Sequence, residues 1–115
     1  MGSDVGAGTG FGMLKEGLQA YLLQRLHVEG YPLTPAHLLY LITRAGAEAL
    51  GMYEAGDLSP GRYADFVYVR PPEHSVLASV NRNVDNEEHA LASLFTLAGT
   101  ESIAGTWVRG RQVYP

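Results

Sequence analysis

The spacing of apolar residues predicts two helices in the first half of the chain. Leucine and tyrosine side chains recur every three or four positions, with polar side chains between them, so residues 11–27 are expected to form an amphipathic helix. A second apolar face covers residues 38–49. Thr34 is a suitable N-cap for this second helix, Pro35 suits its first turn, and Gly51 suits the position just after its end.

Glycines predict two further features of this half. Five of them stand at alternating or nearly alternating positions in the first twelve residues, so residues 1–12 are predicted to form a loop. Gly46 lies inside the second predicted helix. Because glycine costs about 1 kcal/mol relative to alanine in a helix, we expect another segment to pack closely against Gly46.

The second half of the chain predicts a mixture of strand and helix. The polar residues 73–86 are expected to form a loop with one helical turn. A third helix follows, with Asp85 or Asn86 as its cap and Gly99 at its end. The predicted strands cover residues 66–70, 103–108 and 112–114, and the last two form a hairpin that turns at Arg109 and Gly110.

Composition and charge exclude several kinds of partner. The chain has 115 residues, 46% of them hydrophobic and 17% charged, which suits one small globular unit. The net charge is −4 and no lysine- or arginine-rich run occurs, so neither nucleic acid nor an anionic membrane surface is an expected partner. No apolar run approaches the roughly 20 residues of a membrane span. Cysteine is absent, which fits a reducing compartment, and we expect a cytoplasmic protein.

Asp4 is the first candidate for chemistry, because glycines surround it. Its stretch could be a nucleotide-binding loop, an unstructured start, or the end of a β-strand that belongs to a larger fold. A Walker loop needs a lysine and a hydroxyl residue after its last glycine, and a dinucleotide fingerprint needs a full strand before it. Neither is present. At the end of a barrel strand, Asp4 would point into an active site, where a carboxylate can bind a metal ion or move a proton.

The histidines of this chain form no metal-binding motif in the sequence. They lie far apart, with no H-x-H or H-E-x-x-H spacing between them. Each is expected to be solvated or to cap a helix. The four are His27, His37, His74 and His89.

A long central segment resembles the C-terminal signature of the amidohydrolase superfamily. The segment is LTPAHLLYLITRAGAEALGMYEAGDLSPGRYADFVYV, residues 33–69. The signature combines a Ser/Thr-Pro helix start, a helix of small residues ending in ALG, a glycine turn, a PG-basic-x-ADF element and a strand. Gly61 is expected to turn the chain, and Asp65 to cap a turn before the strand. The matching positions include Thr34, Pro35, Gly46, Gly51, Gly61 and Asp65.

Both ends of the chain resemble the guanine deaminases of that superfamily. The stretch GSDVGAGTGFGML is similar to the loop after their eighth barrel strand, and Asp4 falls on their metal-site aspartate. Residues 91–115 are similar to the ending of these enzymes, where a helix runs into a glycine turn and a hairpin. Gly10 and Gly12 depart from the family, which commonly has serines there, so this loop lacks the hydroxyl groups that those serines carry.

The resemblance implies an α/β fragment of a larger fold. Residues 1–52 would be the end of a (β/α)8 barrel, namely the loop after strand 8 and the helices that follow. Residues 53–115 would be the C-terminal part of a small β-sandwich beside the barrel, with an inserted helix. A closed barrel needs about 250 residues, so its other strands and its histidine ligands would belong to a longer chain.

Without that barrel, the apolar faces of the helices would lack the surface that they cover. Soluble monomers rarely expose large apolar patches, so we expect this chain alone to self-associate or to form a homo-oligomer. The side chains expected to be exposed are Leu14, Leu18, Leu22, Leu38 and Leu41.

The resemblance also implies the hydrolytic deamination of guanine to xanthine and ammonia. A zinc ion would activate a water molecule, and Asp4 would act both as a metal ligand and as a catalytic residue that takes the proton of the water. Because zinc sites use three or four protein ligands, the chain alone is expected to bind no zinc and to be inactive. Nothing in this segment identifies the residues that bind the substrate.

Two alternatives to this interpretation remain open. The parent enzyme could be another deaminase, or a chlorohydrolase-type enzyme, of the same superfamily. The chain could also be a free-standing, non-catalytic assembly module.

Overall fold

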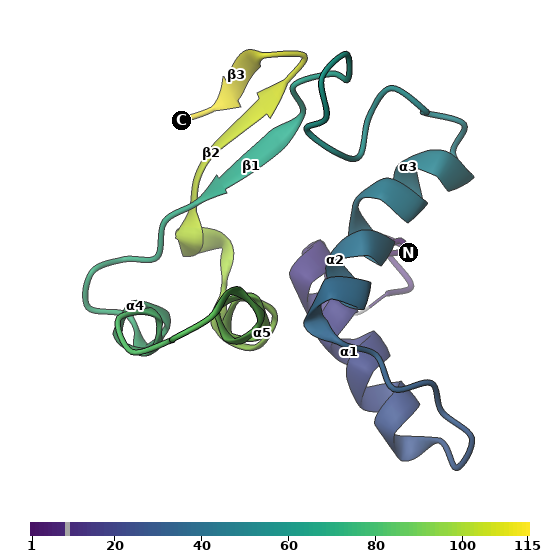
Figure 1. Cartoon of the computed structure of the whole chain (residues 1–115), viewed down its shortest axis with the longest axis vertical. Helices are drawn as coiled ribbons and strands as arrows, with labels where there is room; N and C mark the ends of the chain where they lie inside the picture. The colour runs from purple at the N-terminus through teal and green to yellow at the C-terminus, as the bar shows by residue number, and fades with distance from the viewer. Residues whose placement is uncertain (9) are drawn as a thin grey trace.

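The computed structural model describes residues 1–8 and 10–115, which form five short α-helices, one 3₁₀-helix and a three-stranded sheet (Figure 1). Thr9, which belongs to the predicted N-terminal loop, lies outside the described residues. In chain order the elements are α1 (Met13–Leu26), α2 (Pro35–Ile42), α3 (Arg44–Ala49), β1 (Phe66–Val69), α4 (Val76–Asn81), α5 (Glu87–Leu97), η1 (Thr100–Ser102), β2 (Ile103–Val108) and β3 (Arg111–Tyr114).

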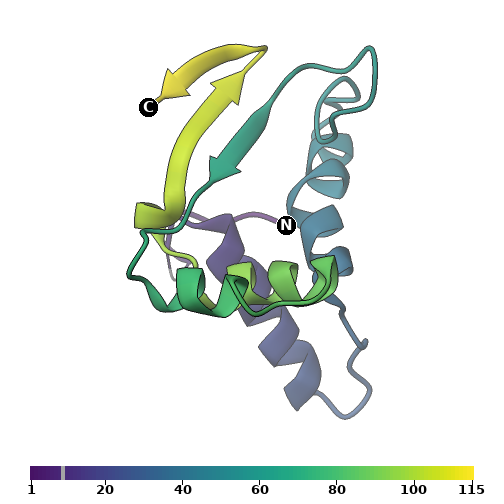
Figure 2. The same cartoon turned by 60° about the vertical axis from the view of Figure 1, so that its left-hand side comes forward.

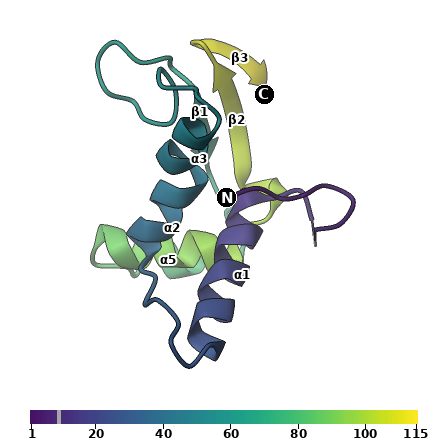
Figure 3. The same ribbon diagram turned by 90° about the vertical axis from the view of Figure 1, so that its right-hand side faces the viewer.

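The helices and the sheet occupy different regions of the molecule. Helices α1, α2 and α3 stand on one side, the sheet stands on the other, and α4 and α5 lie below the sheet (Figure 1). Helix α5 crosses α1 and contacts both α1 and α2 (Figure 2). Seen from the right-hand side of Figure 1, α1 and α2 run beside each other (Figure 3). The segment between β1 and β2 therefore connects the two regions through α5.

The sheet is antiparallel, with the order β1-β2-β3. Phe66 of β1 pairs with Trp107 of β2, and their rings are stacked with centroids 4.7 Å apart. Arg109 and Gly110 form the turn between β2 and β3, with φ values of 50° and 75°. Two positive φ values in a two-residue turn match the twist of a β-hairpin. The predicted strands and the predicted hairpin are thereby confirmed.

The second predicted helix is divided into α2 and α3 at Thr43, so the prediction of one continuous helix is wrong. Thr43 has φ −117° and ψ −95°, which are not helical values. Its hydroxyl donates a hydrogen bond of 2.7 Å to the Leu39 carbonyl one turn earlier. Such side-chain bonds to the preceding turn bend helices.

The prediction that another segment packs closely against Gly46 is also wrong. A Cβ atom at Gly46 would lie 3.5 Å from the Leu41 carbonyl oxygen, an ordinary contact. The close approach occurs instead at Gly56, where a Cβ atom would lie 2.8 Å from the Arg44 Cα atom and 2.9 Å from the Ala47 Cβ atom. The turn after α3 therefore packs back onto that helix.

The helices of the second half follow the sequence patterns closely. Asn86 caps α5, because its side-chain oxygen accepts a 2.8 Å hydrogen bond from the His89 backbone N–H. Ser75 caps α4 in the same way through the Ala78 N–H, at 3.1 Å. The single predicted helical turn is a six-residue helix, and the 3₁₀-helix η1 has no counterpart in the prediction.

The buried apolar core of the described residues is small, and it lies partly around α5 and partly in the turn after α3. It consists of Leu38, Ala55, Leu77 and Phe95. Leu38 is only 3% exposed, so the expectation that it would be exposed without a barrel is wrong, because α5 packs against α2. Of the other four leucines expected at the surface, Leu22 is exposed. The remaining three are partly covered, namely Leu14, Leu18 and Leu41. Several large side chains are much more open, including Phe11, Leu23, Leu26, Val28 and Leu50.

Candidate functional site

The predicted loop contains Asp4 in an unusual backbone conformation. Asp4 has φ 45°, in the left-handed region that few residues other than glycine occupy, although aspartate is among the more tolerant. Its carbonyl oxygen accepts hydrogen bonds from the backbone N–H groups of Ala7 and Gly8, at 2.9 and 2.6 Å. Two amides thus hold the Asp4 carbonyl group in one orientation.

The side chain of Asp4 is exposed, and its carboxylate has no bonding partner among the described residues. No described residue forms a hydrogen bond or an ion pair with it. The segment before it forms no strand within the described residues, although the Met1 nitrogen lies 3.4 Å from the Leu41 carbonyl oxygen of α2. A strand at this position would need neighbouring strands, and the only sheet of the described residues is β1-β2-β3.

Asp4 offers one possible ligand for the zinc ion implied by the sequence, and the described residues do not complete a site. Within residues 1–8 and 10–115, no three histidine, aspartate or glutamate side chains lie close enough together to hold a metal ion. A zinc site requires three or four protein ligands. The described residues therefore do not form a zinc site by themselves.

The Thr-Pro element of the central motif is a helix cap. The Thr34 hydroxyl accepts a 3.3 Å hydrogen bond from the His37 N–H, and the His37 ring nitrogen accepts one of 3.2 Å from the Thr34 N–H. This reciprocal pair is a capping box, and Pro35 follows at the first helical position. His37 therefore helps to begin α2.

An ion-pair network connects α3 to the turn that follows it. The Arg44 guanidinium contacts Glu48 and Asp57, each at 2.8 Å, and Arg62 lies 3.7 Å from Asp57. The Ser59 N–H donates a 2.9 Å hydrogen bond to Asp57. This hydrogen bond, with help from Arg62 and Arg44, lowers the pKa of Asp57 below its ordinary value. Sequence reasoning missed the network, because Arg44 and Asp57 are thirteen positions apart and no periodic signal relates them.

The ADF element connects the start of β1 to the hairpin turn. The Asp65 carboxylate accepts a 2.6 Å hydrogen bond from the Arg109 N–H, a partner 44 residues away. Sequence reasoning expected Asp65 to cap a local turn instead. The Arg109 guanidinium lies over the Tyr63 ring, 4.6 Å from its centroid, and a hydrogen bond with Glu54 raises the pKa of Tyr63.

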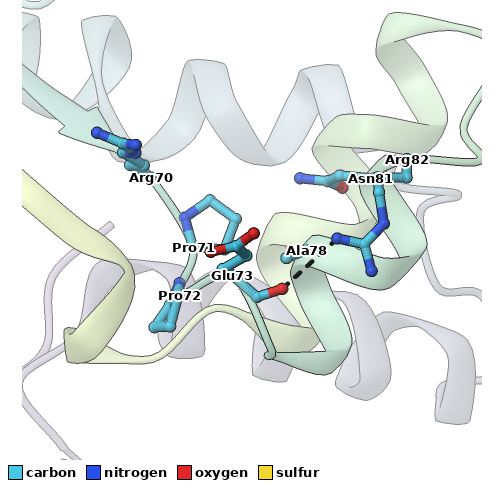
Figure 4. Close-up of a pocket in the computed structure, with 7 residues that line it drawn as sticks. All are labelled: Arg70, Pro71, Pro72, Glu73, Ala78, Asn81 and Arg82. Carbon is cyan, nitrogen blue, oxygen red and sulfur yellow. Dashed lines mark hydrogen bonds between the residues drawn. The ribbon is translucent and has the colours of Figure 1, made fainter.

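An open hollow of about 680 Å³ lies between the end of β1 and α4 (Figure 4). The Arg82 guanidinium reaches across it toward the Glu73 carbonyl oxygen, at 3.5 Å. Its lining contains none of the residues that the sequence predicted for the site. The lining residues are Arg70, Pro71, Pro72, Glu73, Ala78, Asn81 and Arg82.

The helices of the described residues are too short or too polar to cross a bilayer.

The fold and its central motif define a member of the amidohydrolases. The Amidohydrolase family matches residues 1–113, so this chain belongs to that family. Within the family, the chain is 50% identical over 116 residues to the probable guanine deaminase of Deinococcus radiodurans. It is 38% identical over 118 residues to the guanine deaminase of Escherichia coli strain K12. The resemblance to guanine deaminases predicted from the sequence is thereby confirmed.

A solved structure supports the same relationship. The structure of E. coli guanine deaminase matches with a TM-score of 0.89 and 37% identity. The match covers 99% of this chain and 27% of the other. The two curated relatives are likewise covered over 26% of their length, so the chain spans about a quarter of the proteins that it matches.

Proposed function

We propose that this chain is the C-terminal quarter of an enzyme that hydrolyses guanine to xanthine and ammonia. Residues 1–52 would complete a (β/α)8 barrel, and residues 53–115 would contribute β1, β2, β3 and the inserted α5 to an adjoining β-sandwich. The observation that carries this proposal is the 50% identity with a probable guanine deaminase over 99% of this chain. The TM-score of 0.89 with the E. coli enzyme adds a match in three dimensions.

Asp4 is the residue of this chain that we assign to the reaction. Its carboxylate is exposed and forms no hydrogen bond or ion pair with another described residue, which leaves both oxygens available. An ionised carboxylate accepts hydrogen bonds in several directions, so it can orient a water molecule and take its proton. A zinc ion held mainly by residues outside this chain would supply a more acidic water.

Exposed apolar side chains support a larger assembly of which this chain is one piece. Phe11 is 83% exposed, Leu26 is 82% exposed and Leu50 is 77% exposed. Burying such side chains contributes about 1.5–3 kcal/mol each. We assign the covering surface to the barrel strands and helices that the rest of the enzyme would supply. The expected self-association of the chain alone and its cytoplasmic location stay predictions.

The test uses the full-length protein that contains this chain, with guanine as the substrate. Wild-type enzyme is expected to release ammonia and xanthine in equal amounts. Asp4→Asn, which removes the base but keeps the shape, should lower kcat by about 10²–10⁴-fold. Asp85→Asn is the matched control, because Asp85 is an exposed aspartate in the loop before α5 and should leave kcat unchanged.

Three results would contradict the proposal. The first is turnover of cytosine or of a chlorinated heterocycle with none of guanine, which would indicate another enzyme of the family. The second is full activity of Asp4→Asn. The third is guanine turnover by residues 1–115 alone, because a single carboxylate cannot hold the zinc ion that the reaction requires.

A further inference from the structure

The close approach of Gly8 to the residues around Asp4 has no counterpart elsewhere in the described N-terminal loop. A Cβ atom built on Gly8 would overlap the Ser3 carbonyl oxygen. It would also lie 3.0 Å from the Ser3 carbonyl carbon and 3.2 Å from the Asp4 carbonyl oxygen. All three are backbone atoms, so no side chain can rotate away to make room.

Other glycines of the same loop are not confined in this way. A Cβ atom at Gly2 or at Gly12 would meet no atom within 4 Å. Neither has a positive φ angle that would strain another residue. A Cβ atom at Gly6 would also meet no atom within 4 Å, but the φ of 103° at Gly6 would strain any other residue there.

We propose that Gly8 is a positioning residue, whose missing side chain keeps the Asp4 carboxylate in place; this inference rests on the function proposed for Asp4. The Gly8 N–H donates to the Asp4 carbonyl oxygen at 2.6 Å, so the loop closes directly on the Asp4 backbone. A methyl group at position 8 would push the peptide between Ser3 and Asp4 away. That peptide determines the direction of the Asp4 Cα–Cβ bond.

A small displacement of this carboxylate has a large effect in an active site. Moving a reacting group by about 1 Å can lower a rate by about 10²-fold. Groups that orient a zinc ligand affect metal affinity by about 10- to 100-fold. The described residues of the loop, 1–8 and 10–12, include no buried side chain, so the same change should have little effect on the stability of the whole fold.

The experiment compares Gly8→Ala with Gly12→Ala and Gly2→Ala in the full-length enzyme. Gly8→Ala should lower kcat by about 10²-fold. Its zinc affinity, measured by competition with a chelator, should fall by about 10- to 100-fold. The KM for guanine and the thermal unfolding midpoint should stay at the wild-type values. Both control variants should match wild type in all four measurements.

A double-mutant cycle separates positioning from a general effect on the loop. In the Asp4→Asn background, Gly8→Ala should cause no further loss of kcat, because two residues that act through one group are not additive. Additive losses would overturn the proposal. A Gly8→Ala enzyme that behaves like Gly12→Ala, or that does not fold, would overturn it as well.

The failure of this inference can be distinguished from the failure of the proposed function. If wild type binds zinc but does not deaminate guanine, the proposed function is wrong, and the zinc affinities of Gly8→Ala and Gly12→Ala still test the positioning role. If wild type binds no zinc, both proposals are wrong. If wild type deaminates guanine and Gly8→Ala does so equally well, only the positioning role is wrong.

Discussion

The aromatic ring of Phe95 lies against the backbone of Gly17, where helix α5 crosses helix α1. A Cβ atom at Gly17 would lie 2.5 Å from the Phe95 Cε1 atom and 2.8 Å from its Cδ1 atom. Gly17 is buried, and Phe95 is only 4% exposed. The ring thus fills the space that a side chain at position 17 would occupy. This contact joins the segment inserted into the sheet to the first helix of the chain.

Gly17→Ala should destabilise the protein even though alanine favours helices. Replacing glycine by alanine inside a helix stabilises the helix by about 1 kcal/mol. Overpacking a filled core costs about 1–3 kcal/mol, and Phe95 is buried at this contact. We therefore expect a net loss of up to roughly 2 kcal/mol, seen as a lower thermal unfolding midpoint of the full-length protein.

Gly46→Ala is the matched control for that change. Gly46 is also helical, but its added Cβ atom would make only ordinary contacts, the nearest at 3.5 Å. The midpoint of this variant should be unchanged or higher, by up to about 1 kcal/mol of stability. Equal effects of the two substitutions would contradict the assignment of the Gly17 contact.

Thr34→Ala should shorten or fray the start of α2. The substitution removes one half of the capping box and leaves the His37 N–H without its side-chain acceptor. Loss of an N-cap costs about 1 kcal/mol. Thr34→Ser keeps the hydroxyl and should restore most of the thermal midpoint. A serine variant as unstable as the alanine variant would show that the threonine methyl group, and not the cap, matters.

Asp57→Asn should change how stability depends on pH. The folded state lowers the pKa of Asp57 below its ordinary value of 3.8, chiefly through the hydrogen bond from the Ser59 N–H. A group with a lowered folded pKa stabilises the protein above its unfolded pKa, and this contribution is lost as the pH falls through the folded pKa. The difference in unfolding midpoint between wild type and variant should thus be constant near neutral pH. It should shrink below about pH 4, and a difference that persists unchanged at pH 2.5 would contradict this origin.

Asp65→Ala should loosen the hairpin turn from the start of β1. It removes the acceptor for the Arg109 N–H, a contact of 2.6 Å. Hydrogen bonds to charged groups contribute about 1.5–3 kcal/mol. Asp65→Asn keeps an acceptor oxygen and should lose less. Amide hydrogen exchange at Arg109 is the direct measurement, and it should become faster in the alanine variant than in the asparagine variant.

Local patterns in the sequence determined most of the secondary structure. Leucine spacing predicted α1, Asn86 predicted the start of α5, and the Arg109-Gly110 pair predicted the hairpin. These features depend on residues within a few positions of one another, so they can be predicted from the local sequence. The central motif, residues 33–69, likewise indicates the amidohydrolase family from the sequence alone.

Contacts between distant residues were decided only by the tertiary structure. The break at Thr43 opposed a strong helical pattern, and the hydrogen bond from Asp65 spans 44 residues. The closeness of Gly17 to Phe95 depends on which segments cross in space. Periodicity reports which face of an element is apolar, but not which other element covers it. The sequence therefore placed Asp4 in a loop, and only the folded backbone showed that the loop closes on it.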